Sequence, residues 1–250
     1  MTGQSGGPAL LPDAEGKTAF ITGAGGGIGQ AIVALFRSAG VRVAAVDIGA
    51  LDEPADDYWP LKTDCTDERQ IKASIGAAAH RYGEIDFLVH AVGAVGEGPL
   101  VDVSRADWDR LLAVNLTSAF LVTREAFTRL RRPGASVVLF SSTNGRNGGS
   151  TLSGPAYAAA KAGILNLTRY LAKEWSEPGV RVNCMAPGPV DTPMLDRLEN
   201  GAREALRNAL FQGEISTAAQ IAGTVGWLCS SHAASVTGAC LNMSGGLVLD

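Results

Sequence analysis

Tyr157 and Lys161 lie four residues apart in the stretch YAAAK, which belongs to an alanine-rich segment. That spacing is close to one turn of an α-helix, so the phenol and the ammonium fall on the same helical face. A tyrosine hydroxyl has an unperturbed pKa near 10. For acid–base work near neutral pH this pKa must fall by about three units, which means that the phenolate is favoured by roughly 4 kcal/mol. A neighbouring ammonium favours the phenolate, so the pair is a candidate acid–base device. The alternative is an ordinary helix in which the two residues are neighbours by geometry alone.

A glycine-rich stretch, TGAGGGIG, spans residues 22–29 between an apolar segment and an amphipathic one. In this setting a glycine turn lets the backbone N–H groups at the start of a helix approach a pyrophosphate. Asp47 ends the next apolar segment, about 20 residues further on, where a carboxylate can hold the ribose hydroxyls of a dinucleotide. The combination favours a dinucleotide site over an ordinary tight turn.

Short β-branched segments alternate with longer Ala- and Leu-rich segments along the chain. This alternation predicts βαβ units, and therefore an α/β fold: a single Rossmann-type doubly wound parallel sheet of about seven strands flanked by helices. Ligands of such sheets lie beyond the carboxyl ends of the strands. The segments that the sequence identifies as strands are KTAFIT, VRVAAVD, IDFLVH, ASVVLF, VRVNCM and ACLNM.

No shift of composition divides the 250 residues, of which 46% are hydrophobic. We therefore expect residues 16–250 to form a single dinucleotide-binding and catalytic domain. Residues 1–15 are rich in Gly and Pro and show no apolar periodicity, which predicts a flexible tail.

Charge and cysteine usage argue against several classes of function. The formal net charge is −4, and Lys and Arg are scattered, so binding to nucleic acid or to a membrane surface is not expected. The four Cys and three His show no metal-ligand spacing, so we expect reduced thiols and no metal. No apolar run is long enough for a membrane span, and a cytoplasmic protein is the default expectation.

In the order and spacing of these motifs, the sequence resembles the short-chain dehydrogenase/reductase family from Lys17 onward. TGAGGGIG resembles the TGxxxGxG cofactor loop of the family, and YAAAK resembles its YxxxK pair. Ser141 and Ser142 match its catalytic serine site, Asn115 its active-site asparagine, and PGPVDT its PG loop, which ends in a threonine that contacts nicotinamide.

The resemblance implies a role for each of four catalytic residues. Tyr157 would be the general acid/base, and Lys161 would lower the pKa of Tyr157 and bind the nicotinamide ribose. Ser142 would hydrogen-bond the substrate oxygen. Asn115 would hold a water in a proton relay, at a local distortion of the helix that contains it; its alternative is a buried polar residue without that role.

The resemblance also gives the residues expected to bind the cofactor. They are Gly23, Gly25, Gly27, Ile28, Gly29, Asp47, Asp64, Cys65, Ala91, Gly93, Tyr157, Lys161, Pro187, Gly188, Val190 and Thr192.

Three departures from the family pattern stand out. HAVG, residues 90–93, replaces the usual NNAG, so the side-chain hydrogen bonds of two asparagines are expected to be missing. MSGG, residues 243–246, replaces the usual DGG near the end of the chain. The loop from Ser142 to Tyr157 is slightly long, which leaves Ser141 as the alternative catalytic serine.

The expected function is the transfer of a hydride between a secondary alcohol or its ketone and NAD. NAD is preferred over NADP because Asp47 would repel a 2′-phosphate. Two alternatives remain: an NADPH-dependent carbonyl or 3-oxoacyl-thioester reductase, and a non-catalytic NAD-binding sensor.

Substrate and assembly are less constrained. A small-molecule substrate with polar or anionic groups is predicted from Asn144, Arg146 and Asn147, although these residues also suit an exposed turn. The segment from Val190 to about Glu214 is expected to be a mobile lid. The family resemblance implies a homotetramer, with the helices of Asn115 and Tyr157 at one interface and the C-terminal segment at another.

Overall fold

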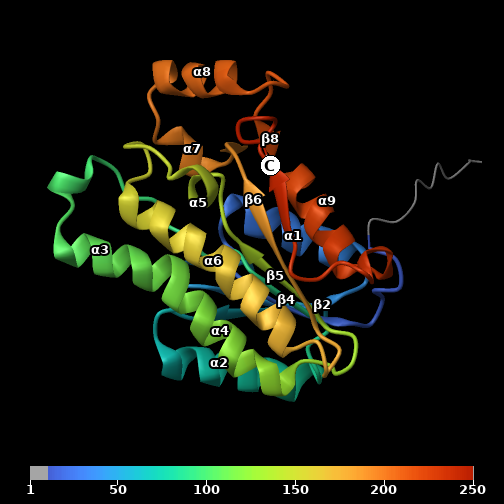
Figure 1. Cartoon of the computed structure of the whole chain (residues 1–250). Coiled ribbons are helices and arrows are strands. Elements are labelled where there is room, and N and C mark those ends of the chain that lie inside the picture. The colour runs from blue at the N-terminus through green and yellow to red at the C-terminus, as the bar shows by residue number, and fades with distance from the viewer. Residues whose placement is uncertain (1–10, 250) are drawn as a thin grey trace, which may run out of the picture.

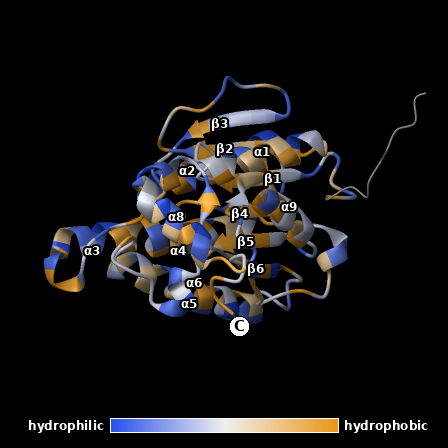
Figure 2. Ribbon diagram, turned by 90° about the horizontal axis from the view of Figure 1, so that it is seen from above, coloured by the Kyte–Doolittle hydropathy of each residue, from blue (hydrophilic) through white to orange (hydrophobic). Residues whose placement is uncertain are grey.

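The computed structural model describes residues 11–249 and has one central parallel sheet of seven strands in the order β3-β2-β1-β4-β5-β6-β9. Figure 2 shows the strands from β3 to β6 in this order. Strands β1 to β3 extend the sheet to one side, and strands from β4 onward extend it to the other. This reversal of strand order between β1 and β4 makes the sheet doubly wound, as the sequence predicts. The strands are β1 (Thr18–Thr22), β2 (Arg42–Asp47), β3 (Tyr58–Lys62), β4 (Phe87–His90), β5 (Ser136–Phe140), β6 (Arg181–Pro187) and β9 (Cys240–Met243).

Helices cover both faces of the sheet. Figure 1 shows α2, α4 and α6 on one face, and α1 and α9 on the other. The bounds are α1 (Gly27–Ser38), α2 (Glu68–Tyr82), α3 (Arg105–Leu112), α4 (Ser118–Ala126), α5 (Asn144–Asn147), α6 (Pro155–Glu174), α7 (Pro193–Asp196), α8 (Asn200–Ala209) and α9 (Ala218–Cys229). Short 3-10 turns lie at Leu100–Asp102, Phe127–Arg129 and Ser231–Ala233, and a π-helical turn at Ala113–Thr117 joins α3 to α4.

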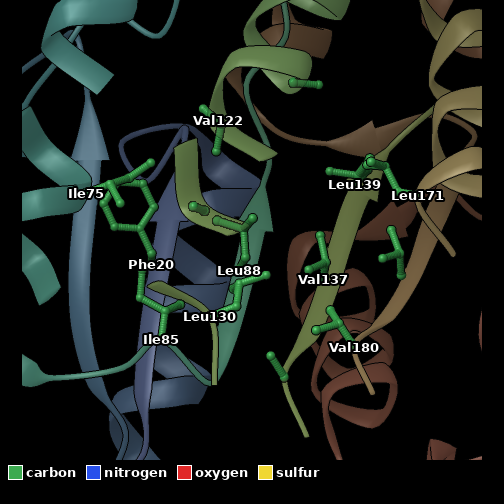
Figure 3. Close-up of a cluster of buried hydrophobic side chains, with 14 of the residues drawn as sticks. Phe20, Ile75, Ile85, Leu88, Val122, Leu130, Val137, Leu139, Leu171 and Val180 are labelled. Carbon is green, nitrogen blue, oxygen red and sulfur yellow. The ribbon is translucent and has the colours of Figure 1, made fainter. Parts of the chain in front are cut away.

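Alternation along each strand divides the core into two halves. Phe20 of β1 and Leu88 of β4 face α2 and α4, whereas their neighbours Ile21 and Val89 face α1 and α9. Figure 3 shows the first half, in which the ring of Phe20 lies against Ile75 of α2. Each fully buried aliphatic or aromatic side chain of this kind contributes about 1.5–3 kcal/mol, so the two halves hold the strand ends in fixed positions.

Two features differ from the sequence prediction. Residues 11–15 do not belong to a flexible tail, because Leu11 and Ala14 are buried against the core half that contains α1. The predicted tail is therefore too long at its C-terminal end, and residues 1–10 lie outside the described residues.

The structure also contains a second, two-stranded parallel sheet, formed by β7 (Val190–Asp191) and β8 (Ser216–Thr217). Between them the chain forms α7 and α8, which Figure 1 shows above the end of the sheet where β6 stops. This short pairing closes residues 190–217 into a loop. That loop contains the segment predicted as a lid, Val190 to about Glu214.

Candidate active site

The glycine-rich stretch forms the turn between β1 and α1. Gly23 has a φ of +73°, and a Cβ on Gly29 would lie 2.0 Å from the carbonyl oxygen of Gly23. Neither position accepts a side chain without a shift of the backbone. The stretch is therefore shaped for close approach of backbone groups.

The N-terminus of α1 is free to bind an anion. Gly26 caps the helix without a side-chain hydrogen bond, and the first turn contains no acidic residue. The first N–H groups of a helix need a partner, and the helix dipole favours a negative one. A dinucleotide pyrophosphate fits both requirements.

Asp47 lies at the carboxyl end of β2, next to the glycine turn. Its Oδ2 accepts a hydrogen bond from the N–H of Gly25 at 2.9 Å, and its Oδ1 accepts one from the N–H of Gly49 at 2.9 Å. The carboxylate therefore caps the turn that follows β2 and also holds the glycine turn. It also faces the cleft, where the predicted ribose contact would be made.

A cleft of about 580 Å³ runs along the carboxyl ends of the strands. Eleven of the sixteen predicted cofactor residues line it, and the others line a second cavity that shares part of its wall. No Lys or Arg is among the described residues that line the cleft. Lining residues that sequence reasoning missed are Gly26, Ile48, Thr63, Thr66, Val92, Ala94, Val114, Pro193 and Met194.

Lys161 is buried at the boundary between the cleft and the second cavity. Its Nζ donates a hydrogen bond of 2.8 Å to the carbonyl oxygen of Phe140, at the end of β5. A Cβ on Gly93 would lie 3.3 Å from this Nζ, so Gly93 leaves room above the amine. Burial lowers the pKa of Lys161 from its usual 10.5 to about 8.

Tyr157 lies one turn before Lys161 on α6, with its ring centroid 5.6 Å from the Lys161 Nζ. Burial raises the pKa of Tyr157, whereas a hydrogen bond with Ser142 and the charge of Arg197 lower it. The expected lowering of this pKa by the Lys161 amine stays a prediction. The Lys161 amine is directed at the Phe140 carbonyl, and desolvation of the phenol is the largest effect on Tyr157.

The two candidate serines have different surroundings. The hydroxyl of Ser141 donates to the carbonyl oxygen of Lys161 at 2.8 Å, which fixes α6 against β5. Ser142 hydrogen-bonds Tyr157, and its Oγ also accepts from the N–H of Asn144 at 3.2 Å. The geometry therefore brings Ser142, not Ser141, to the phenol.

Asn115 lies in the π-helical turn at Ala113–Thr117, so the helix is distorted where the sequence places it. Its side-chain nitrogen donates to the carbonyl oxygens of Ala94 and Leu111, at 2.8 and 2.9 Å, and its Oδ1 accepts from the N–H of Ala94. Asn115 does not line either cavity. Its side chain holds the loop after β4 beside Lys161, a positioning role that the sequence did not indicate.

Comparisons with known proteins agree with this geometry. A family model described as enoyl-(acyl carrier protein) reductase matches residues 23–248. A 3-oxoacyl-(acyl-carrier-protein) reductase of Thermotoga maritima is 36% identical over 94% of this chain and 99% of its own. The chain belongs to the short-chain dehydrogenase/reductase family. It is thus an oxidoreductase of a family that uses a nicotinamide cofactor, NAD or NADP.

Two further members of the short-chain dehydrogenase/reductase family illustrate the range of this similarity. A cis-4-hydroxycyclohexanecarboxylate dehydrogenase of Sinomonas cyclohexanicum is 34% identical over 92% of this chain and 96% of its own. A solved structure described as a short-chain dehydrogenase/reductase, glucose/ribitol dehydrogenase, from Brucella melitensis has a TM-score of 0.89 and 29% identity, and covers 94% of this chain and 98% of its own.

In this short-chain dehydrogenase/reductase the first position of HAVG is a buried histidine that makes two side-chain hydrogen bonds. His90 is buried, with its Nδ1 2.8 Å from the Thr22 hydroxyl and its Nε2 3.0 Å from the Ser118 hydroxyl. Burial and the charge of Lys161 lower the pKa of His90 to about 3, so the ring is neutral. His90 joins β1, β4 and α4 with these hydrogen bonds, which the sequence did not indicate.

The stretch MSGG, which stands where the family usually has DGG, makes contacts of its own. The hydroxyl of Ser244, in MSGG, donates to the carbonyl oxygen of Val248 at 3.1 Å. Gly188 of the PG loop lies against it, since a Cβ on Gly188 would be 3.0 Å from the Ser244 Cα. The C-terminal segment thus supports the PG loop in this enzyme.

A second cavity, of about 220 Å³, opens beside Tyr157 and Ser142. The segment of residues 190–214, called the lid segment below, supplies much of its wall through Met194, Leu195, Arg197, Leu198 and Leu206. Of the three residues expected at the substrate mouth, Asn144 lines this cavity, whereas Arg146 and Asn147 do not. Arg197, which the sequence did not single out, lines it instead.

Ion pairs hold the lid segment in its observed position. Arg203 of α8 contacts Asp191 of β7 and, at 3.1 Å, Asp196 of α7. These side chains are largely exposed, and exposed pairs are worth about 0–1 kcal/mol each. These pairs therefore add little to the stability of the lid segment, and its opening stays a prediction.

Residues 11–249 contain no group of three or more His, Cys, Asp or Glu that could hold a metal ion. No helix in that range is both long and apolar enough to cross a membrane.

Proposed function

We propose that this protein is an NAD-dependent dehydrogenase/reductase that interconverts a secondary alcohol and its ketone. The observation that carries the proposal is the contact between Tyr157 and Ser142 in the small cavity, which shares Gly93 and other wall residues with the cofactor cleft. A bound nicotinamide cofactor supplies the hydride acceptor, so that a secondary alcohol and NAD⁺ become a ketone, NADH and a proton.

The residues of this chain would handle the oxygen and the proton. Ser142 would hydrogen-bond the substrate oxygen beside Tyr157, and the tyrosine hydroxyl would give a proton to a ketone oxygen or take one from an alcohol. Burial raises the pKa of Tyr157, so near neutral pH the residue carries the proton that ketone reduction consumes. Oxidation needs the phenolate, which the nearby positive charges of Lys161 and Arg197 favour.

Asp47 supports NAD over NADP. The carboxylate is fixed by the Gly25 and Gly49 N–H groups at the cleft wall. A 2′-phosphate there would meet a like charge, and no Lys or Arg among the described lining residues would compensate it. Arg42 does not help, because its guanidinium hydrogen-bonds Gly16 and Thr18 at the opposite end of the sheet.

We expect kcat/KM with NAD to exceed kcat/KM with NADP at least tenfold, equivalent to about 1.4 kcal/mol. Asp47→Ala should shrink this ratio, chiefly by weakening the binding of NAD. The measurement is steady-state kinetics with both cofactors on one alcohol. Asp56→Ala is a matched control, because it removes an exposed carboxylate that does not line the cleft.

The main rival is an NADPH-dependent 3-oxoacyl-thioester reductase. The similarity to the Thermotoga maritima reductase favours this rival, whereas Asp47 opposes it. Equal use of both cofactors by the unmodified protein would remove the argument from Asp47 and support the rival. Binding of NADH without turnover of any alcohol, ketone or thioester would support a sensor.

The assembly belongs to the same proposal. Figure 1 shows α4 and α6 side by side on one face of the molecule. Phe120 of α4 and Tyr170 of α6 expose 45% and 62% of their surfaces, and Trp227 of α9 exposes 37%. Large exposed apolar side chains on neighbouring helices are typical of a contact surface, and we propose a homotetramer that uses the α4/α6 face and a C-terminal face.

Light scattering at micromolar concentration is expected to give about 103 kDa, four times the 25.8 kDa of one chain. Phe120→Asp should reduce the mass, because a charge in the contact surface is costly to bury. A mass of one chain for the unmodified protein would contradict the proposal.

We also propose a cytoplasmic location, because the cysteines are free thiols, which are typical of a reducing compartment.

A further inference from the structure

The cavity beside Tyr157 has a single positively charged group at its outer wall. Among the described lining residues the ionisable cations are Lys161, which belongs to the cofactor boundary, and Arg197 of the lid segment; no Asp or Glu lines the cavity. Most of the remaining wall is apolar, with Leu152, Leu198 and Leu206 among its side chains. The cavity therefore has an acid–base end and a cationic side, separated by apolar surface.

Arg197 is held in place without being neutralised. Its Nη2 donates to the carbonyl oxygen of Leu152 at 2.5 Å, which joins the lid segment to the loop before α6. No ion pair joins Arg197 to an acidic side chain in the described part of the chain, unlike Arg203 on the same segment. A guanidinium has five N–H donors, so most of those on Arg197 are available to a ligand.

Arg197 lines the same cavity as Tyr157 and lies near its hydroxyl. Its charge acts on the Tyr157 hydroxyl and lowers the pKa of that group. Arg197 therefore lies close enough for a small molecule to span from Tyr157 to the guanidinium. The cavity volume of about 220 Å³ is below the roughly 300–1,000 Å³ of sites for drug-sized ligands, which favours a small substrate.

We propose that the substrate is a small hydroxy acid or oxo acid, whose carboxylate pairs with Arg197 while its alcohol or ketone oxygen meets Tyr157 and Ser142. A carboxylate matches the planar donor pattern of a guanidinium and can bind it with two parallel hydrogen bonds. The reaction is the oxidation of the secondary alcohol to the ketone by NAD⁺, with release of NADH and a proton; the carboxylate is unchanged. This inference rests on the proposed function and specifies its substrate class.

One relative supports the same chemistry independently of the geometry. The name of the Sinomonas cyclohexanicum relative describes an enzyme that acts on cis-4-hydroxycyclohexanecarboxylate, a secondary alcohol with a carboxylate on the far side of a small ring. Such a molecule carries both of the groups that we expect the cavity to bind, an alcohol for Tyr157 and a carboxylate for Arg197.

The test compares each acid with its neutral carboxamide. The probes are 3-hydroxybutyrate, 4-hydroxypentanoate and cis-4-hydroxycyclohexanecarboxylate, each with the matching carboxamide, and the readout is kcat/KM with NAD. We expect the acid to be preferred at least tenfold for one or more pairs. The preference should reside mainly in KM, because the carboxylate contact is made equally before and during the hydride step.

Variants separate charge recognition from a structural role. Arg197→Gln keeps a donor for the Leu152 carbonyl but removes the charge, and should lower the acid-to-amide ratio at least tenfold. Arg197→Lys should retain part of the ratio. Arg207→Ala removes a charge from α8 at a residue outside the cavity lining, and should leave the ratio as it is in the unmodified protein.

The possible failures are distinguishable. If alcohols are oxidised but no acid is preferred over its amide, or if Arg197→Gln keeps the full preference, the carboxylate proposal is wrong and the proposed function stands. If neither cofactor supports turnover of any alcohol or ketone, the proposed function fails and this inference falls with it.

Discussion

Tyr157→Phe is expected to lower kcat by about 10²–10⁴-fold, the range in which general acid–base catalysis contributes to enzymatic rates. The phenyl ring fills the same space, so the packing of α6 against β5 should persist. The hydroxyl that hydrogen-bonds Ser142 is the group that is lost. Among the described residues, the other side-chain hydrogen bond of Ser142 is accepted from the backbone N–H of Asn144.

The measurement separates catalysis from binding. NADH affinity of Tyr157→Phe, followed by cofactor fluorescence, should change little, while turnover of the best alcohol falls. Tyr170→Phe is the matched control, because Tyr170 lies on the same helix and is 62% exposed. A Tyr157→Phe variant that retained more than a tenth of the unmodified rate would exclude Tyr157 as the general acid/base.

The fold could be predicted because its signals are local and regular. The buried strands β1, β2, β4, β5 and β6 are short apolar segments, and a glycine or a serine follows each of them within three residues. In a parallel sheet the carboxyl ends of such strands meet at one edge. Gly23, Asp47, Gly93, Ser142 and Pro187 therefore converge even though they are far apart in the sequence.

The third strand was the exception among the strands of the main sheet. The sequence required a strand between Asp47 and the fourth strand but did not locate it, since YWPLK contains a proline and is only partly buried. A proline is tolerated there because β3 is an edge strand of the sheet. Its position follows from pairing with β2, which is tertiary information.

The parts of the site that were missed depend on packing across the fold. His90 bonds Thr22 and Ser118, which come from two other elements, and the pattern HAVG indicates neither partner. Arg197 is one of several arginines in a polar stretch, and only the position of the lid segment brings it to the cavity. The pKa of Tyr157 was predicted from spacing alone, whereas its burial, which has the larger effect, is set by the whole site.

Lys161→Ala is expected to lose both cofactor affinity and turnover. The side chain is buried and bonded to the Phe140 carbonyl, and its replacement removes the only amine beside Tyr157 among the described lining residues. A hydrogen bond to a charged group contributes about 1.5–3 kcal/mol, equivalent to a roughly ten- to 150-fold weaker binding of NADH. Turnover should fall further, because the positive charge that favours the phenolate is lost.

Lys161→Met distinguishes the loss of charge from the loss of volume, since it fills nearly the same space without an amine. It should share the defects in NADH binding and turnover. A variant that bound NADH as tightly as the unmodified protein would exclude a cofactor role for this amine. The two substitutions should differ in stability, because Lys161→Ala leaves a cavity and Lys161→Met does not.

The pH dependence of stability provides a check on Lys161 that is independent of activity. Its pKa is about 8 in the folded protein and near the usual 10.5 in the unfolded chain. Between these values the unfolded state binds more protons, so the free energy of unfolding rises with pH across this window. Relative to Lys161→Met, the unmodified protein should gain about 2–3 kcal/mol between pH 8 and 10.5, as measured by urea denaturation of both proteins across this range. A difference that did not change with pH would mean that the amine is not desolvated, and the buried position assigned to Lys161 beside Tyr157 would be wrong.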